Sequence, residues 1–243
     1  MTSNHLNAIA NRQLWFSVGQ NFNDPFDCSL NVPINLMTGS SMLNFIKEKT
    51  SASYLKLMGI ISDEHINNIA LKHIKNAQRL VDAGKIEEHP INLVLQYVLE
   101  YLHRSFVCCF SKNATNHLLW SHYANSHTGY CIRYKYESLL QDIRLRRYGD
   151  VIYDDSPIDL LSVFTDNMDV ALDIIFRKSF CWKYEDEVRF IHDELSECEN
   201  DRYKVCTHSD DVIDCIILGY NFDISRLDEL KSIVANKNIL FKK

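Results

Sequence analysis

The sequence predicts an α+β fold built on a mixed, mainly antiparallel sheet. From Phe106 onward the chain is dominated by short runs of β-branched and aromatic residues, which are typical of strands: FVCCFS, GYCIRY, GDVIY, EVRFIH, YKVCTH and CIILGY. Residues 40–104 differ, because their apolar residues recur at helical spacing. Strands and helices therefore do not alternate regularly along the chain, and this order favours an α+β fold.

We expect residues 1–243 to form a single domain, with residues 40–104 as a helical insertion within it, because 243 residues suit one large domain. The N-terminal part adds a short helix and the strand QLWFSV. Two further helices are expected, one at residues 157–180 between the strands and one at residues 225–236 after them.

The expected insertion has its own helix boundaries. Ser62 is a typical N-cap, and Asp63 and Glu64 would complement the helix dipole in the first turn. Gly84 is suited to the residue that ends this helix. Pro90 suits the first turn of a second helix, which carries an apolar stripe.

Composition excludes some classes of protein. The formal net charge of −6 gives the whole chain no basic field that would attract nucleic acid. No apolar run approaches the ~20 residues that are needed to cross a bilayer. The start, MTSNHLNAIANRQ, lacks the basic and apolar segments of a signal peptide. We therefore expect a cytoplasmic protein without a membrane partner.

The eight cysteines are expected to be reduced and mostly buried. None forms a C-x-x-C pair, so the usual spacing of zinc and redox sites is missing. Most lie in apolar runs, where free cysteine behaves as a small hydrophobic residue.

A first candidate site is the turn FNDPFD, residues 22–27. Pro25 disfavours helical geometry at Asp24, and Asn23 can bond to nearby backbone. The flanking Phe22 and Phe26 are expected to be buried. The turn is then either a purely structural anchor or one wall of a cleft with Asn23 or Asp24 at its rim.

A second candidate site is the segment LLWSHYANSHTGYCIRY, residues 118–134. His117, His122 and His127 recur every five residues, and such a step rotates by ~140° on a helix, so we expect no metal site there. Trp120, His122 and Tyr123 precede a turn and a strand. They would either form a ring-stacking pocket or divide between the core and the surface.

A third candidate site is CWKYEDEVRFIH, residues 181–192. Read as a strand, it places Glu185, Glu187 and Arg189 on one face, with Val188 and Phe190 buried on the other. Two carboxylates this close repel unless a cation lies between them. Arg189 could be that cation in a solvated ion-pair ladder, or a cationic substrate could be.

Taken in order, these segments resemble a large bacterial family that is catalogued as a domain of unknown function. The shared features are an aromatic-Phe-Ser segment before FNDPFD, then CFS, W-S-H-Y, G-x-C-I, W-x-Y-E-x-E-x-R and I-I-L-G. The resemblance runs from Thr2 to about Gly219, with residues 40–104 as a variable insertion. The family is often linked to phage-defence and abortive-infection loci, which implies a partner protein from a defence or toxin–antitoxin operon.

The layout is also similar to that of the ADP-ribosyltransferase superfamily. This resemblance implies NAD as the substrate, a protein or nucleic acid as the acceptor, and no metal. It makes Glu187 the catalytic carboxylate and Glu185 the residue that chooses or activates the acceptor. Arg133 and Arg12 would meet the pyrophosphate. The residues implied to bind NAD are Trp120, Ser121, His122, Tyr123, Asn23 and Asp24.

The implied chemistry suits these residue types. Cleavage of the nicotinamide–ribose bond leaves an oxocarbenium-like centre, which a carboxylate stabilises. An aromatic wall can stack on the cationic nicotinamide ring. We therefore expect an NAD-dependent ADP-ribosyltransferase or NAD glycohydrolase of a bacterial defence or toxin system.

The sequence departs from its relatives at the start. They carry a segment like Leu-Tyr-Lys-Tyr before the Thr2-Ser3 pair, and in the superfamily that strand supplies an Arg or His to NAD. Either the true start lies upstream, or the strand is missing, or a residue such as His122 takes its place. Two alternatives are a non-catalytic interaction module, such as an antitoxin or immunity component, and a nucleotide or nucleic-acid hydrolase that uses His122 with Glu187.

Overall fold

The computed structural model describes residues 3–28, 59, 62–85, 88, 91–156, 169–195, 202–234 and 240–242. The chain divides into two compact units. The first consists of Met1–Cys28, His103–Asp155 and Phe176–Lys243, and the second of Ser29–Leu102 and Ser156–Ile175.

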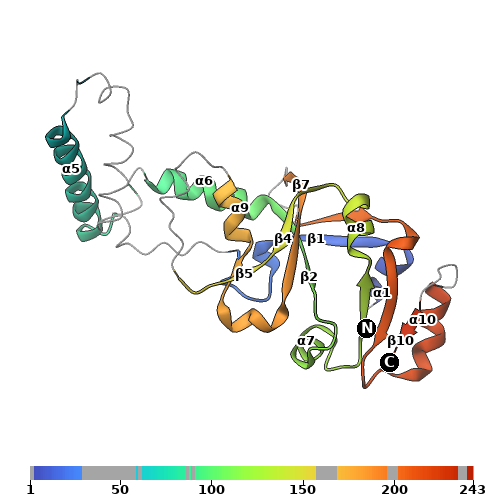
Figure 1. Ribbon diagram of the computed structural model, residues 1–243. Helices are drawn as coiled ribbons and strands as arrows, with labels where there is room; N and C mark the ends of the chain where they lie inside the picture. The colour runs from blue at the N-terminus through green and yellow to red at the C-terminus, as the bar shows by residue number, and fades with distance from the viewer. Residues whose placement is uncertain are drawn as a thin grey trace. The chain divides into compact units, whose positions relative to one another are not determined.

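The first unit is built on a five-stranded sheet in the order β4-β7-β2-β1-β8 (Figure 1). Each neighbouring pair in this sheet is antiparallel. The strands are β1 (Gln13–Val18), β2 (Ser105–Ser111), β4 (Leu145–Asp150), β7 (Glu187–Leu195) and β8 (Tyr203–Thr207). The predicted α+β class with a mainly antiparallel sheet is confirmed.

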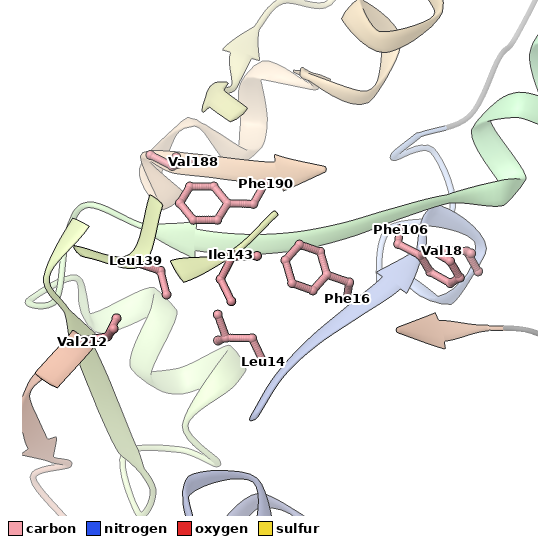
Figure 2. Close-up of a cluster of buried hydrophobic side chains, with 9 residues drawn as sticks. All are labelled: Leu14, Phe16, Val18, Phe106, Leu139, Ile143, Val188, Phe190 and Val212. Carbon is pink, nitrogen blue, oxygen red and sulfur yellow. The ribbon is translucent and has the colours of Figure 1, made fainter. Parts of the chain in front are cut away.

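One face of this sheet carries the hydrophobic core, which we call the core face. Alternate residues of β1, β2 and β7 point to it, as the pleat of a strand requires. They pack against Leu139 of helix α8 (Tyr136–Asp142) and its neighbour Ile143. In Figure 2, Val18 and Phe106 lie together at one end of the cluster, in agreement with their pairing across β1 and β2. The buried members are Leu14, Phe16, Val18, Phe106, Leu139, Ile143, Val188, Phe190 and Val212.

A second sheet of three strands has the order β10-β9-β3. Strand β9 (Ile213–Leu218) pairs antiparallel with β3 (Tyr130–Tyr134) and parallel with β10 (Leu240–Lys242), which the sequence did not predict. The helices α1 (Ser3–Ala10) and α10 (Leu227–Ile233) contact each other and lie side by side in Figure 1. Their apolar residues pack with those of β9 in a second core.

Short elements complete the first unit. They are η1 (Gly19–Asn21), α7 (His117–Tyr123), β5 (Ile152–Tyr153), β6 (Arg177–Lys178), η4 (Phe180–Glu185), η5 (Asp210–Val212) and η6 (Ile224–Arg226). Strands β5 and β6 form a small parallel pair. The helix predicted at residues 157–180 is therefore wrong at its end, because Arg177 and Lys178 pair with β5 and Phe180 opens a 3-10 helix.

The second unit is helical where it is described. Helix α5 (Asp63–Asp82) begins after Ser62, whose hydroxyl accepts a hydrogen bond from the His65 amide at 3.3 Å. Gly84 follows its end with a φ of +65°, which glycine adopts at little cost. Helix α9 (Asp169–Ile175) belongs to this unit, whereas α6 (Ile91–Arg104) crosses the boundary between the units. These boundaries confirm the predicted cap and stop of α5.

Parts of the expected insertion lie outside the described residues, including Pro90 and all but one residue of 40–61. That residues 40–104 are an insertion into a single domain stays a prediction. Among the helices that the structure describes, none has the length and apolar character required to cross a bilayer.

Candidate functional site

The FNDPFD turn follows β1 and η1, but only part of its expected arrangement is found. Phe26 is 76% exposed, so the prediction that both phenylalanines are buried is wrong. The buried Asp24 explains this, because its Oδ1 accepts the Phe26 amide at 2.9 Å and closes a tight turn that directs Phe26 outward. Phe22 is half-buried, with the guanidinium carbon of Arg189 5.5 Å from its ring centroid.

The last residue of the turn, Asp27, is a site residue that sequence reasoning missed. Its two carboxylate oxygens accept hydrogen bonds from Nη1 and Nη2 of Arg189 at 2.8 and 2.6 Å. Arg189 is completely buried, with 0% of its surface exposed. A bidentate pair between Arg and a carboxylate is strong and fixes orientation. The turn is therefore joined to β7 through charged groups and not through two buried aromatic rings.

Glu185 and Glu187 converge, although not as a single strand would bring them together. Glu185 ends the 3-10 helix η4, and Asp186 then adopts a left-handed φ of +45° before β7 begins at Glu187. The prediction that Glu185 lies on the strand is therefore wrong. Both glutamates are 4% exposed, which also excludes a solvated ion-pair ladder.

Lys178 of β6 holds the two glutamates together, and it too was missed. Its Nζ donates to Glu185 at 2.6 Å and to Glu187 at 3.2 Å, and it lies 3.4 Å from Asp27. Arg189 donates from Nε to Glu187 at 2.7 Å. We call Asp27, Lys178, Glu185, Glu187 and Arg189 the charge cluster. It combines three carboxylates with two cations, so its ionised form carries one negative charge in excess.

The charge cluster holds Glu187 in its ionised form. Burial alone would raise the pKa of Glu187, but the hydrogen bonds and charges of Arg189 and Lys178 outweigh burial and hold it below the ordinary value. Burial alone would lower the pKa of Lys178, and the neighbouring carboxylates outweigh that effect and raise it. At neutral pH Glu187 is therefore a fixed negative charge and not a group poised for proton transfer.

A chain of hydrogen bonds links the charge cluster to two predicted residues. The hydroxyl of Tyr123, the last residue of α7, donates to Oε1 of Glu185 at 2.7 Å. Nδ2 of Asn23 donates to the same hydroxyl at 3.2 Å. The side chain of Asn116, the N-cap of α7, donates to the Tyr184 carbonyl at 2.9 Å and so ties α7 to η4.

The charge cluster opens into a cleft of about 660 Å³. Asp27, Lys178, Glu185 and Glu187 line it, whereas Arg189 lies behind them. Aromatic side chains make much of the remaining wall. The principal aromatic lining residues are Trp15, Phe22, Phe110, Trp120, Tyr123 and Tyr130. A cavity of this size, with converging polar groups on an apolar wall, has the character of a small-molecule site.

The predicted NAD-binding residues divide into two sets. Asn23, Trp120 and Tyr123 line the cleft, whereas Asp24, Ser121 and His122 do not. Ser121 donates instead to the His117 carbonyl at 2.9 Å. His122 is exposed, and the centroid of its ring lies 6.4 Å from that of Trp182 and 6.3 Å from that of Tyr184.

Each predicted pyrophosphate residue has a carboxylate partner at the surface of the protein. Arg133 lines the cleft but is paired with Asp214. Arg12 lies 3.5 Å from Asp210 and does not line the cleft. Within the described ranges, no group of three or more His, Cys, Asp or Glu side chains is arranged to hold a metal ion.

The seven described cysteines are free, but the expectation that most are buried is wrong, since only Cys28 and Cys215 are buried. Cys109 is accessible from the cleft and packs against Glu187. Close packing of protein atoms around the sulfur and the negative charge of Glu187 both raise the pKa of its thiol, although part of the residue surface stays open to the cleft. Cys109 therefore adds a thiol to the wall of the cleft beside Glu187.

Fold and site together define an α+β protein with a buried charge cluster at an aromatic cleft. Residues 119–190 match a family model described as a protein of unknown function (DUF2971). The match includes Trp120, Tyr123 and every member of the charge cluster except Asp27, and covers less than a third of the chain. No curated protein and no solved structure matches the chain. The predicted resemblance to a domain of unknown function is confirmed over these residues.

Proposed function

We propose that this cleft binds NAD and cleaves its nicotinamide–ribose bond, in an ADP-ribosyltransferase or an NAD glycohydrolase. The observation that supports this best is the excess negative charge of the charge cluster beside an aromatic wall. A cleft of this kind favours a ligand that is planar and positively charged at its reacting end. The nicotinamide ring of NAD has both properties.

The reaction requires a negative charge that stays in place while positive charge moves. When the bond between C1′ of the ribose and the ring nitrogen breaks, its electron pair goes to the nitrogen. Positive charge then develops on C1′ and the ring oxygen of the ribose. Water or an acceptor group attacks C1′ and loses its proton. A preorganised, ionised carboxylate stabilises this centre without rearranging, which is the state in which Glu187 is held.

The other residues have roles that follow from their positions. Trp120 and Tyr123 would stack on the nicotinamide ring. Glu185 would act on the acceptor, held in position by hydrogen bonds from Tyr123 and Lys178. Asn23 would position Tyr123 through its hydrogen bond to the hydroxyl. A cytoplasmic role in a bacterial defence or toxin system, with a partner protein from the same operon, completes the proposal.

The test is incubation with NAD labelled in the nicotinamide in one sample and in the adenine in another. Release of the first label measures bond cleavage, and attachment of the second label to added protein or nucleic acid measures transfer. The matched control is Glu137→Gln, because Glu137 is an exposed glutamate in the first turn of α8. The proposal expects release by the unmodified protein and by this control, and strongly reduced release by Glu187→Gln. No release by the unmodified protein would contradict it.

One observation favours a second candidate, a non-catalytic interaction module. Both carboxylate oxygens of Glu185 and of Glu187 already accept hydrogen bonds within the protein. In such a module the charge cluster would serve the fold alone, and the same labelled samples would show no release from any variant.

A further inference from the structure

A second cavity of about 540 Å³ lies in the first unit, between α1, the start of β1, the end of α7 and β3. It shares four wall residues with the cleft: Tyr123, Ala124, Tyr130 and Ile132. The residues that line only this second cavity are Ala8, Ile9, Gln13, Asn125, Gly129, Tyr134, His208 and Ile213.

The described wall of this cavity contains no Asp, Glu, Lys or Arg side chain. The lining is largely apolar, and its polar side-chain groups are amides, phenols and one imidazole. A charged ligand would lose part of its hydration here without gaining a partner of opposite charge from the wall, which is unfavourable. The cavity therefore selects neutral ligands, in contrast to the cleft.

His208 is the polar group that gives the cavity a specific chemistry. It is 6% exposed, and its Nδ1 lies 2.8 Å from the Ser209 carbonyl oxygen. A carbonyl oxygen only accepts hydrogen bonds, so Nδ1 carries a hydrogen, and in the neutral form of an imidazole the other ring nitrogen, here Nε2, is an acceptor. No donor to Nε2 is found among the residues that the structure describes.

The ring of His208 is also held in place. Its backbone amide donates to the Arg12 carbonyl at 2.9 Å. The ring of Tyr134 meets it edge-on, with centroids 5.6 Å apart and planes at 86°. His208 lines the cavity, and its Nε2 is not a buried atom without a partner. An acceptor of fixed orientation at such a wall favours a ligand whose donor can replace water there.

We propose that this second cavity binds a neutral, planar heteroaromatic ring that bears an N–H donor. The donor would bond to Nε2 of His208, and the ring would pack on Tyr134 and Ile132. Two sources carry this chemistry, a pyridine carboxamide such as nicotinamide and a purine base such as adenine. The cavity lies within the size range of small-molecule sites, roughly 300–1,000 Å³. This inference does not require that the cleft cleave NAD.

Nicotinamide and adenosine are the two probes, titrated separately into full-length protein labelled with ¹⁵N at histidine. The expected result is saturable binding by one probe, with a shift of the His208 Nε2 resonance toward lower frequency as it accepts a hydrogen bond. The probe that produces this shift identifies the source. Nicotinic acid has the same ring with a negative charge, and it should bind at least tenfold more weakly because burial of an unpaired charge is unfavourable.

Two variants on one helix locate the site. Ala8→Leu extends a side chain from the cavity wall and should weaken binding at least tenfold. Ala10→Leu is the matched control on the exposed side of α1 and should leave binding unchanged. His208→Phe keeps a ring but removes the acceptor, and loss of one hydrogen bond should weaken binding about tenfold.

Three results would overturn the inference. They are an unmoved Nε2 resonance at saturation with both probes, equal binding of nicotinic acid, and binding that is weakened by Trp120→Ala in the cleft but not by Ala8→Leu. Because the readout is binding to unmodified protein, it is independent of NAD cleavage. Failure here would leave the proposed function untouched, and the reverse also holds.

Discussion

The two faces of strand β7 in the five-stranded sheet are both buried, but by different means. On the core face, Phe16, Val188 and Phe190 are removed from water by packing against α8 and its surroundings. On the opposite face, the intervening residues of β7, Glu187 and Arg189, are equally inaccessible. Apolar packing is non-directional and roughly proportional to the area removed from water. Burial of charges succeeds only when each one has partners, so the residues of the charge cluster depend on one another.

This difference predicts that a substitution in the charge cluster lowers the free energy of unfolding more when it leaves a larger uncompensated charge behind. The largest effect is expected for Arg189→Met, which leaves three carboxylates facing Lys178 alone. Removal of one partner from a buried ionic group typically costs about 3–5 kcal/mol of the free energy of unfolding. Urea unfolding followed by circular dichroism measures the loss. A loss below about 1 kcal/mol, the range of exposed ion pairs, would show that the cluster is solvated.

A double substitution sharpens the same comparison. Lys178→Met removes the cation that Glu185 and Glu187 share, and Lys178→Met with Glu185→Gln also removes one of the carboxylates left behind. The double variant should be more stable than the sum of the two single losses predicts, by about 1–3 kcal/mol, because residues of one network couple. A full cycle of urea unfolding curves gives this coupling energy. A simple sum would mean that the two residues act independently, as distant sites do.

Of the two faces of β7, only the one with the charge cluster should make stability depend on pH, because the core face carries no charge. The pKa of Glu187 is lower in the folded protein than its ordinary value of 4.5, so its contribution is fully present above pH 4.5 and is lost as the pH falls through the folded value. The pKa of Lys178 is raised above 10.5, so its contribution is fully present below pH 10.5 and is lost as the pH rises through the folded value. Urea midpoints should therefore fall at both extremes, and Glu187→Gln should flatten the acid side.

The smallest effect on stability is expected for Glu187→Gln. It leaves two carboxylates facing two cations, and the bidentate pair of Asp27 with Arg189 stays intact. Glu187 accepts three hydrogen bonds from Lys178 and Arg189, and a glutamine keeps only one of the two acceptor oxygens. We therefore expect a loss of about 1–2 kcal/mol of the free energy of unfolding, below that of Arg189→Met. The matched comparison is Glu185→Gln, which removes the charge of the other glutamate that Lys178 binds and should behave similarly. A loss as large as that of Arg189→Met would refute the charge-balance account.

The sequence correctly predicted those features of the fold that depend on residues close together in the chain. The alternation in EVRFIH correctly placed Val188 and Phe190 in the core, and Ser62 correctly marked the start of α5. Glu187 and Tyr123 were singled out, and both line the cleft. These features depend on residues that are close neighbours in the chain.

Long-range charge pairing was not predictable in this way. Asp27 and Arg189 are separated by 162 positions, and no local pattern links them. Lys178 lay inside a segment expected to be helical, and its role became visible only once β6 was paired with β5. The left-handed Asp186 and the turn closed by Asp24 overrode the expected strand and the expected burial of Phe26.

The central claim is that the charge cluster serves chemistry as well as the fold, and Glu187→Gln separates these two roles. The decisive measurement is the rate of release of labelled nicotinamide from NAD by the unmodified protein, by Glu187→Gln and by Glu137→Gln, together with the urea midpoint of each. The account predicts that Glu137→Gln leaves both the midpoint and the release unchanged. It predicts that Glu187→Gln stays folded with a modestly lower midpoint. Its release should be lower by about 10²-fold or more, the scale on which electrostatic groups act at active sites. Equal release by Glu187→Gln and the unmodified protein would contradict it.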